Sequence, residues 1–152
     1  MSVEIRNCSY ADVSEDPSFP RLSAAYARES GIEGLPSPTP DTAHYLAADS
    51  CGLCHMIGAY LDEELIGFVN VLVASFPHYS TKIATLESWF VHPEHRHTGA
   101  GLALKAAAER TAIAHGAAGM FVSTPFGSQL AAVMDAQSSY RETNRVFFKV
   151  FE

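Results

Sequence analysis

Hydrophobic and polar positions change their period several times along the chain, and each change marks a new element. Strict alternation predicts strands, whereas apolar residues spaced three and four apart predict helices. In chain order the predicted elements are a strand over 3–7, helices over 19–29 and 41–48, strands over 56–61, 65–74 and 83–91, a helix over 99–115, a strand over 120–123, a short helix over 130–136 and a final strand or strand pair over 140–151. This order predicts an α/β domain with a mixed sheet.

Two of these elements adjoin each other and frame the chemistry. The strand over 83–91 alternates, so we expect Glu87 to share one face with Thr85, Trp89 and Val91, and the intervening residues to share the other. After Pro93 the period becomes helical. The segment 99–115 holds seven alanines, which are strong helix formers.

The composition is that of one globular domain over residues 1–152. Hydrophobic residues make up 47% and charged residues 18%, which excludes a disordered chain. No run of about 18 apolar residues is present to span a membrane. Residues 1–6 lack the basic and apolar regions of a secretory signal. We therefore expect a cytoplasmic protein with no membrane partner.

Charge is unevenly distributed along the sequence. The net charge of −7 argues against nucleic acid as a partner, because phosphate backbones require a basic surface. Residues 1–80 carry 11 acids and 3 bases, whereas residues 81–152 carry 6 acids and 7 bases. The asymmetry indicates that the two halves face different partners.

Two clusters resemble metal or haem sites at first sight. Residues 51–55 match the C-x-x-C-H pattern of c-type haem attachment, which takes place outside the cytoplasm. No second ligand pair at zinc spacing accompanies them. His92, His95 and His97 lie close together without an acid or cysteine at ligand spacing. We expect neither haem nor metal, and interpret residues 51–55 as a helix end leading into a strand.

The segment from Val91 to Leu102 joins a strand to the alanine-rich helix. Its glycines, Gly99 and Gly101, allow close approach of the backbone to a ligand, and the first N–H groups of the helix have no intrahelical partners. These donors and the positive helix end suit a phosphate, and Arg96 adds a charge. The segment is neither a Walker loop nor a dinucleotide fingerprint, because their spacings are absent.

The sequence from Arg96 to Gly101 resembles the R-x-x-G-x-G/A pyrophosphate loop of the GNAT superfamily of acyl-CoA-dependent N-acyltransferases. Val91 and Pro93 before it are also typical of that family, and the element order matches along nearly the whole chain. The resemblance implies a GNAT-like fold, a single layer of mixed β-sheet flanked by helices. It also implies an N-acetyltransferase, in which a primary amine attacks the thioester of acetyl-CoA directly.

The same resemblance implies where coenzyme A binds. The backbone of Phe90 and Val91 would hold the pantetheine arm, and strands 83–91 and 120–123 would splay apart to admit it. The pyrophosphate would lie on the backbone of Arg96, His97, Thr98, Gly99, Ala100, Gly101 and Leu102.

Glu87 is the expected general base. It lies four residues before Val91, where family members often carry a carboxylate that works through water. An amine acceptor is protonated near neutral pH and must lose a proton before it attacks. The alternative is a solvated strand residue without a catalytic role.

The general acid is less clearly marked. Many family members place a tyrosine on the last short helix to protonate the leaving thiolate, but here that position falls near Asp135. Tyr140 is the candidate, with Ser128 and Ser138 as alternatives. A thiolate can also leave without specific help, because a thiol is far more acidic than an alcohol. In a structural role Tyr140 would be a core aromatic.

The expected partner is a small-molecule amine that carries positive charge. In GNAT-like folds the N-terminal helices usually cover the acceptor side, and here that half is acidic, with Glu29, Glu33, Asp41 and Asp49. Two other readings stay open: a catalytically inactive GNAT-like module that binds acyl-CoA as a sensor, and acylation of a protein N-terminus or lysine. The choice between monomer and homodimer is also open.

Overall fold

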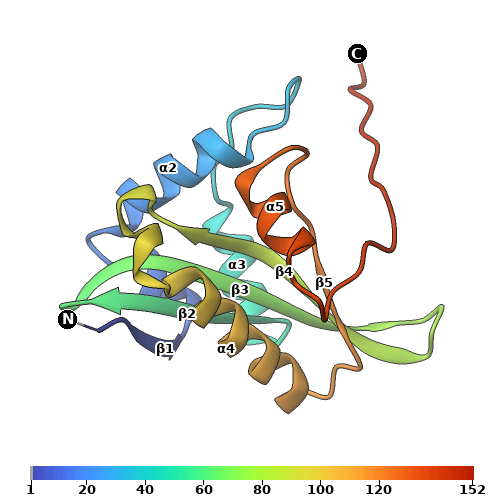
Figure 1. The fold of residues 1–152 in the computed structure, drawn as a ribbon, viewed down its shortest axis with the longest axis horizontal. Coiled ribbons are helices and arrows are strands. Elements are labelled where there is room, and N and C mark those ends of the chain that lie inside the picture. The colour runs from blue at the N-terminus through green and yellow to red at the C-terminus, as the bar shows by residue number, and fades with distance from the viewer. Residues whose placement is uncertain (1) are drawn as a thin grey trace.

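A five-stranded sheet in the order β1-β2-β3-β4-β5 forms the centre of the computed structural model, which describes residues 2–152 (Figure 1). The elements are β1 (Glu4–Cys8), α1 (Tyr10–Ser14), α2 (Phe19–Ser30), α3 (Thr42–Ser50), β2 (Cys54–Leu61), β3 (Glu64–Phe76), β4 (Thr81–Val91), the 3-10 turn η1 (Pro93–Thr98), α4 (Ala100–Ala114), β5 (Met120–Val122) and α5 (Gln129–Asp135). Strands β1 to β4 pair antiparallel, and β5 pairs parallel to β4. The expected mixed sheet flanked by helices is confirmed. No helix among residues 2–152 is long and apolar enough to cross a bilayer.

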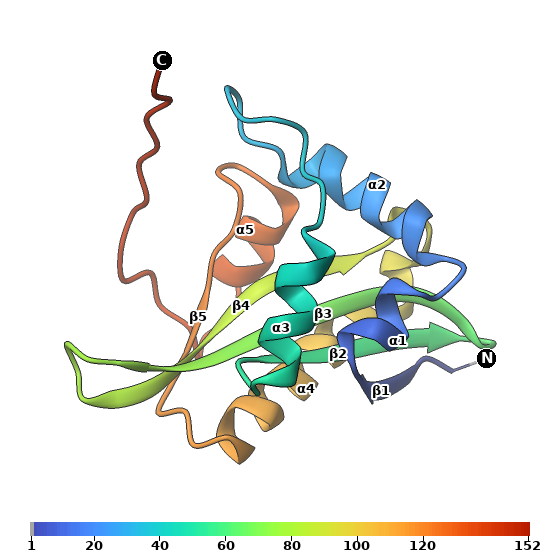
Figure 2. The same cartoon turned by 180° about the vertical axis from the view of Figure 1, so that it is seen from behind.

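Helices cover the two faces of the sheet with different side chains. Helix α4 lies on one face, where its alanines allow close packing (Figure 1). We call this the aliphatic face; its core includes Ile57, Val69, Val71, Leu86 and Leu104. Helices α1, α2 and α3 lie on the opposite side (Figure 2). We call that the aromatic face; its core includes Tyr10, Tyr60, Phe68 and Phe90.

Strand β4 contains a β-bulge at Glu87. Asn70 of β3 lies opposite Ser88, and Val71 lies opposite Leu86, so Glu87 is one extra residue between two paired positions. An extra residue shifts the alternation of all side chains beyond it.

The bulge overturns the simple alternation expected for this strand. Before the bulge Leu86 belongs to the aliphatic core, and after it Trp89 and Val91 pack against that same core. Phe90 belongs to the aromatic core. Glu87 does not share a face with Trp89 and Val91, because its side chain contacts α3 on the aromatic face.

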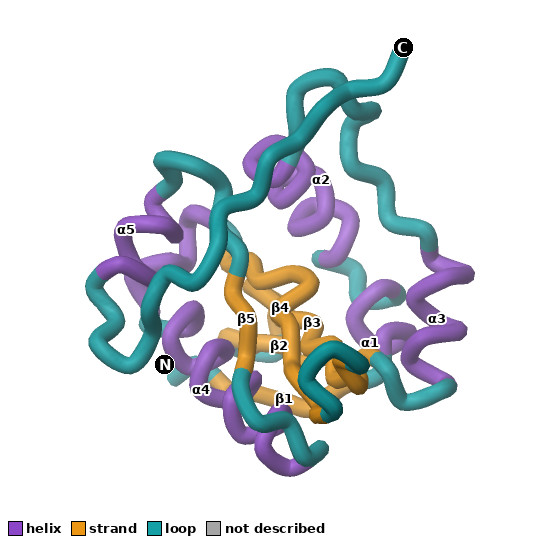
Figure 3. Tube along the Cα trace, turned by 90° about the vertical axis from the view of Figure 1, so that its right-hand side faces the viewer, coloured by secondary structure: helices purple, strands orange, loops and turns teal. Residues whose placement is uncertain are grey.

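The predicted final strand over residues 140–151 is wrong. These residues run extended without a strand partner and rise away from the sheet, where Val150 lies against Gly34 in the loop after α2 (Figure 3). Their β-branched and aromatic composition favours a strand, but strand propensity mainly measures packing against a neighbouring strand. Within the described chain this segment has no such neighbour.

Candidate active site

Strands β4 and β5 part in the middle of β4. They pair over three positions, the last of which joins Leu86 to Val122. Strand β4 continues to Val91, while β5 ends at Val122, so the two diverge toward α5 (Figures 1 and 2). The expected splaying of these two strands is therefore present, and among residues 2–152 it leaves one edge of residues 87–91 without a strand partner.

The backbone of Val91 faces this gap. The His92 N–H donates to the Ile66 carbonyl over 2.9 Å, and hydrogen-bonded pairs alternate along an antiparallel ladder. Val91 therefore points its backbone groups away from β3, and its carbonyl accepts from Arg96 Nε at 3.0 Å. The N–H of Val91 is the group left for a ligand. Phe90 lies opposite Phe68 in the ladder, which turns its backbone toward β3, and its coenzyme contact stays a prediction.

The loop between β4 and α4 has the shape of an anion site. Gly99 adopts a left-handed φ of 83°, which allows the 3-10 turn to lead directly into α4. A Cβ atom at Gly99 would meet nothing within 4 Å, and one at Gly101 would meet only Val91 Cγ2 at 3.9 Å. The Ala100 N–H donates to Thr98 Oγ1 over 3.3 Å, so the N–H groups of Gly101 and Leu102 are the helix donors left for a pyrophosphate. This geometry fits the loop predicted over Arg96, His97, Thr98, Gly99, Ala100, Gly101 and Leu102.

The guanidinium of Arg96 points away from the glycines. Its Nη2 atom donates to Glu29 of α2 over 2.6 Å, and it lies 5.4 Å from the centre of the Phe90 ring. In a second ion pair the arginine lies on α2 and the glutamate on the loop, because Arg21 of α2 binds Glu94 of η1. The Arg96 side chain therefore links the coenzyme loop to α2, while its backbone stays in the loop.

Glu87 is held on both carboxylate oxygens. The Tyr45 hydroxyl of α3 donates to Oε1, and the Asn70 amide of β3 donates to Oε2 over 3.3 Å. Asn70 is 1% exposed, whereas Glu87 is exposed to solvent. Burial, and then the hydrogen bond to Glu87, raises the pKa of Tyr45, so its hydroxyl keeps the proton that it donates. The bulge thus presents an ionisable carboxylate in a fixed orientation.

Tyr45, which contacts this carboxylate, belongs to a group of aromatic rings on the same face. Tyr10 stacks on Tyr45 with ring centres 4.7 Å apart, and Tyr26 meets Phe90 edge-on at 5.2 Å. Burial raises the pKa of Tyr26, and the charge of Glu87 raises it further. A carboxylate among aromatic rings is an environment that favours an organic cation.

Sequence reasoning missed Tyr45 and Asn70. Asn70 left a signal, because it is the one polar residue in the apolar run from Leu65 to Ala74. Tyr45 left none, since an aromatic residue on a short helix is ordinarily a core residue. Its link to Glu87 spans 42 positions of sequence and depends on the folded chain.

Tyr140 lies against α4. Its hydroxyl donates to Glu109 Oε1 over 2.8 Å, and the Lys105 ammonium binds the same oxygen at 2.6 Å. Burial, and then the bond to Glu109, raises the pKa of Tyr140. No hydrogen bond joins Tyr140 to Glu87 in residues 2–152, and its role as general acid stays a prediction. Ser128 caps α5 by accepting from the Ala131 N–H at 3.1 Å.

Residues 51–55 have ordinary structural neighbours, and His92 of the histidine cluster accepts from the Glu94 N–H at 3.3 Å. Cys51 is an exposed helix cap, and Cys54 is buried at the start of β2. His55 stacks on His115 with ring centres 3.8 Å apart. Over the described part of the chain, no group of three or more His, Cys, Asp and Glu side chains could hold a metal ion.

Solved structures with the same fold include several acetyltransferases. A ribosomal-protein-alanine N-acetyltransferase from Brucella melitensis biovar Abortus 2308 is 19% identical, with a TM-score of 0.75 over 99% of this chain and 100% of that one. The aminoglycoside acetyltransferase meta-AAC0020 from an uncultured soil metagenomic sample, in complex with sisomicin, is 16% identical, with a TM-score of 0.74 over 99% and 97%. Aminoglycoside N-acetyltransferase AAC(6')-Iy in complex with CoA is 23% identical, with a TM-score of 0.71 over 98% and 99%. At these identities the likeness shows the fold.

Family membership rests on the sequence. A search of curated proteins gives no match. The model of the acetyltransferase (GNAT) family matches residues 19–133, a range that contains the gap, the coenzyme loop and Glu87. The chain therefore belongs to the GNAT family of acetyltransferases and is an acyltransferase.

Proposed function

We propose that this enzyme transfers the acetyl group of acetyl-CoA to the primary amine of a small cationic acceptor, with Glu87 as general base. GNAT acetyltransferases use acetyl-CoA, so the acceptor and the roles of individual residues are the new part of the proposal. The observation that carries it is the two-sided hydrogen bonding of Glu87 at the point where β4 leaves β5.

The coenzyme would bind along the gap. The N–H groups of Gly99, Gly101 and Leu102 would hold the pyrophosphate, joined by that of Ala100 if it leaves Thr98 Oγ1, and the N–H of Val91 would bind the pantetheine arm. Both parts use backbone donors, which keep their geometry whatever the side chains do. When bound, the coenzyme supplies an acetyl group activated as a thioester.

Glu87 would remove the proton that blocks the acceptor. An ammonium nitrogen has no lone pair, so it loses a proton to Glu87, directly or through a water molecule. The freed nitrogen bonds to the thioester carbonyl carbon, the bond from that carbon to sulfur breaks, and the nitrogen gives a second proton to solvent to leave a neutral amide. The sulfur leaves as a thiolate and takes a proton from solvent or from Tyr140. Tyr45 and Asn70 would orient the Glu87 carboxylate throughout.

The preference for a cation rests on the charge and rings around Glu87. A carboxylate with nearby tyrosine faces attracts an ammonium group both by charge and by cation–π interaction. Two of the acids proposed from sequence have other partners, because Glu29 binds Arg96 and Asp41 caps α3. Glu87 itself therefore carries most of the argument. The similar enzyme meta-AAC0020, which was solved with the aminoglycoside sisomicin, agrees with this choice.

The test compares Glu87→Gln with Glu15→Gln, which changes an exposed carboxylate on the C-cap of α1. Glu87→Gln keeps the shape and removes the base, so turnover should fall by about 10²-fold or more while acetyl-CoA binding is retained. Glu15→Gln should match the wild type. Unchanged turnover in Glu87→Gln would contradict the assigned base.

A panel of cationic, neutral and anionic amines at two ionic strengths tests the acceptor. Thiol release should be most efficient with cations, and the preference should shrink as salt rises. A preference for neutral or anionic amines would remove the cationic acceptor and leave acetyl transfer intact. The same assay should include peptides with free N-termini and lysines. If the protein binds acetyl-CoA but acetylates none of the amines or peptides, the interpretation as a catalytically inactive sensor is favoured.

A further inference from the structure

Helix α2 covers the face of the sheet on which Glu87 lies. Its buried residues belong to the aromatic core, and Tyr26 meets the Phe90 ring edge-on. After Ser30 the chain runs through residues 31–41 without helix or strand. The position of the last turn of α2 therefore depends on the contacts that the helix itself makes.

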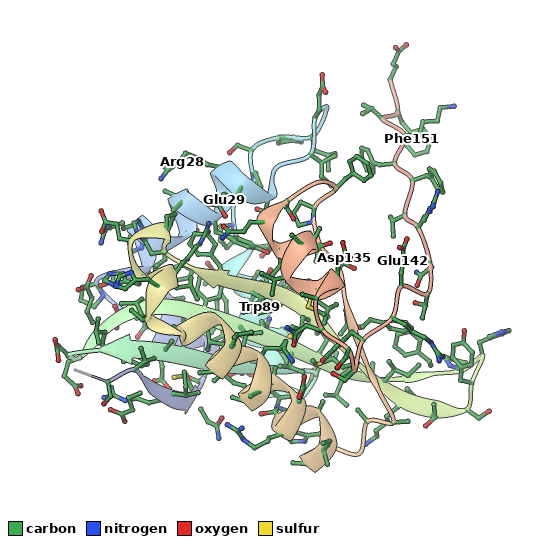
Figure 4. The ribbon with its side chains drawn as sticks, in the orientation of Figure 1. Arg28, Glu29, Trp89, Asp135, Glu142 and Phe151 are labelled. Carbon is green, nitrogen blue, oxygen red and sulfur yellow. The ribbon has the colours of Figure 1, made fainter. Side chains whose placement is uncertain are left out.

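One arginine joins this last turn to the coenzyme loop. Arg96 of η1 donates from Nε to the Val91 carbonyl over 3.0 Å and from Nη2 to Glu29 over 2.6 Å. Its guanidinium carbon also lies 5.4 Å from the centre of the Phe90 ring. Figure 4 shows Glu29 on the side of α2 that faces η1 and β4, and Arg28 on the outer side. The guanidinium thus connects the end of β4, the coenzyme loop and α2.

These contacts change what the charge of Arg96 can do. On sequence grounds it adds a positive charge to the anion site, but in the structure the Glu29 carboxylate neutralises it. The two side chains are 34% and 46% exposed, and an exposed ion pair adds little to global stability. A planar guanidinium with three contacts is nevertheless fixed in orientation. The pair can therefore set the position of α2 without deciding whether the protein folds.

A second ion pair ties the first turns of α2 to the same loop. Arg21 binds Glu94 of η1 and lies 3.6 Å from a carboxylate oxygen of Glu64 at the start of β3. The basic partner is on the helix in this pair and on the loop in the Arg96–Glu29 pair. This opposite arrangement favours one alignment of α2 along the loop, because like charges would meet in others.

We propose that Arg96 is a positioning residue for the acceptor side of the reaction, because through Glu29 it fixes the last turn of α2, with Tyr26, once coenzyme A fills the loop. The pyrophosphate would bind backbone N–H groups of the loop that carries Arg96. Binding there restricts the loop, so Arg96 loses less freedom when it holds Glu29. Coenzyme occupancy is thereby passed to a wall of the acceptor site. This inference rests on the proposed acceptor site beside Glu87.

The first experiment asks whether the guanidinium binds phosphate instead. Arg96→Met keeps the apolar stem, so calorimetry should find its affinity for acetyl-CoA within about threefold of the wild type, whereas a lost hydrogen bond to a charged phosphate costs about tenfold or more. Glu29→Gln frees the guanidinium and should bind acetyl-CoA at least as tightly as the wild type. A loss of about tenfold in Arg96→Met would make Arg96 a phosphate ligand and overturn the inference.

The second experiment measures the coupling by hydrogen exchange, with coenzyme A alone as the probe. In the wild type, coenzyme A should slow exchange in residues 100–106 and also, by at least about threefold, in residues 24–30. Arg96→Met and Glu29→Gln should keep the first protection and lose the second. The double variant should lose no more than either single variant, because both changes remove the same contact. Arg28→Met is the matched control on the exposed side of α2 and should behave as the wild type.

The exchange pattern separates failure of this inference from failure of the proposed function. Protection of the loop alone in the wild type, or protection of α2 that survives Glu29→Gln, would overturn the inference and leave the coenzyme site and Glu87 standing. Faster exchange of α2 on addition of coenzyme A would show that phosphate takes Arg96 from Glu29, which also overturns it. Coenzyme A that protects neither range would overturn the inference together with the coenzyme site. Circular dichroism should show all variants folded.

Discussion

On the α4 face of the sheet the core is built from alanine, valine, isoleucine and leucine, whereas the face under α1, α2 and α3 is built largely from tyrosine and phenylalanine rings. The aromatic face also holds two buried polar atoms, Asn70 Oδ1 and the Tyr10 hydroxyl, for which residues 2–152 supply no hydrogen-bond partner. Aliphatic side chains pack without polar demands, while phenol and amide groups bring hydrogen bonds into the interior. The aliphatic core and the Glu87 carboxylate thus lie on opposite sides of the sheet, and β4 contributes side chains to both.

Leu104→Ala should destabilise the aliphatic core, with the largest loss of unfolding free energy among these predictions. Leu104 of α4 is fully buried, and its truncation should cost about 2–5 kcal/mol of unfolding free energy. Urea unfolding measures the loss, with the exposed Ile113→Ala on the same helix as control. Turnover per folded molecule should be preserved, because Leu104 does not contact the aromatic face. A loss below about 1 kcal/mol would show that the core tolerates the cavity.

Gly99→Val should separate backbone strain from coenzyme binding at the start of α4. A β-branched residue is strained at a φ of 83°, and its side chain enters the space above the loop. Gly116→Val is the control, since Gly116 has a φ of 85° at the other end of α4. Both variants should lose about 1–3 kcal/mol of stability.

Only Gly99→Val should lose the stabilisation by acetyl-CoA, which is about 2.7 kcal/mol at 100 times the dissociation constant. Thermal melts with and without acetyl-CoA measure it. If Gly99→Val melts higher with acetyl-CoA by as much as Gly116→Val does, the coenzyme does not use this loop.

Tyr45→Phe should disturb the aromatic face without unfolding it. Loss of the donor to Glu87 leaves the carboxylate less well oriented, so turnover should fall by about tenfold, or about 1.4 kcal/mol. Tyr10→Phe is the control, because it removes a buried hydroxyl with no hydrogen bond and should keep both turnover and stability. Equal turnover in the two variants would mean that Tyr45 does not position Glu87.

The smallest expected effect is a pH dependence of stability that arises from His55 on β2, which stacks on His115 at the C-cap of α4. Burial, and then the neighbouring His115, lowers the pKa of His55 below its usual 6.5. The unfolded chain therefore binds this proton first, so stability should fall as pH drops below about 6.5 and should not depend on His55 above it. His55→Gln should flatten the fall of the melting temperature between about pH 6.5 and 5, whereas the exposed His78→Gln should not. An NMR titration of His55 with a midpoint above 6.5 would contradict the prediction.

Local signals in the sequence were sufficient for the elements around the coenzyme loop. Alanine content and flanking glycines predict α4 within one residue at each end, and the alternating run predicts β4. Helix α1 was missed because it has only five residues, although Ser9 and Asp12 form its capping box.

The missed features depend on contacts between distant segments. The bulge at Glu87 arises from the pairing of β3 with β4, and no residue type marks it in the sequence. The strand predicted over 140–151 failed for the same reason, since its residues have strand character but no neighbouring strand within the part of the chain that the structure describes. Glu87 was chosen by family resemblance and its role as base stays a prediction, while its hydrogen-bond partners appear only in the fold.

The bulge makes β4 sensitive to length in a way that residue identity does not describe. A strand shows alternate residues to its two sides, so one residue removed between Leu86 and Trp89 would restore regular pairing with β3. Deletion of Glu87 would leave Ser88 opposite Asn70 and remove the carboxylate, whereas deletion of Ser88 would place Glu87 in that paired position, still on the aromatic face. Of the two deletions, only the loss of Glu87 should therefore give a folded protein without the proposed base. The extra residue thus lets two neighbouring positions of β4 face the same side of the sheet.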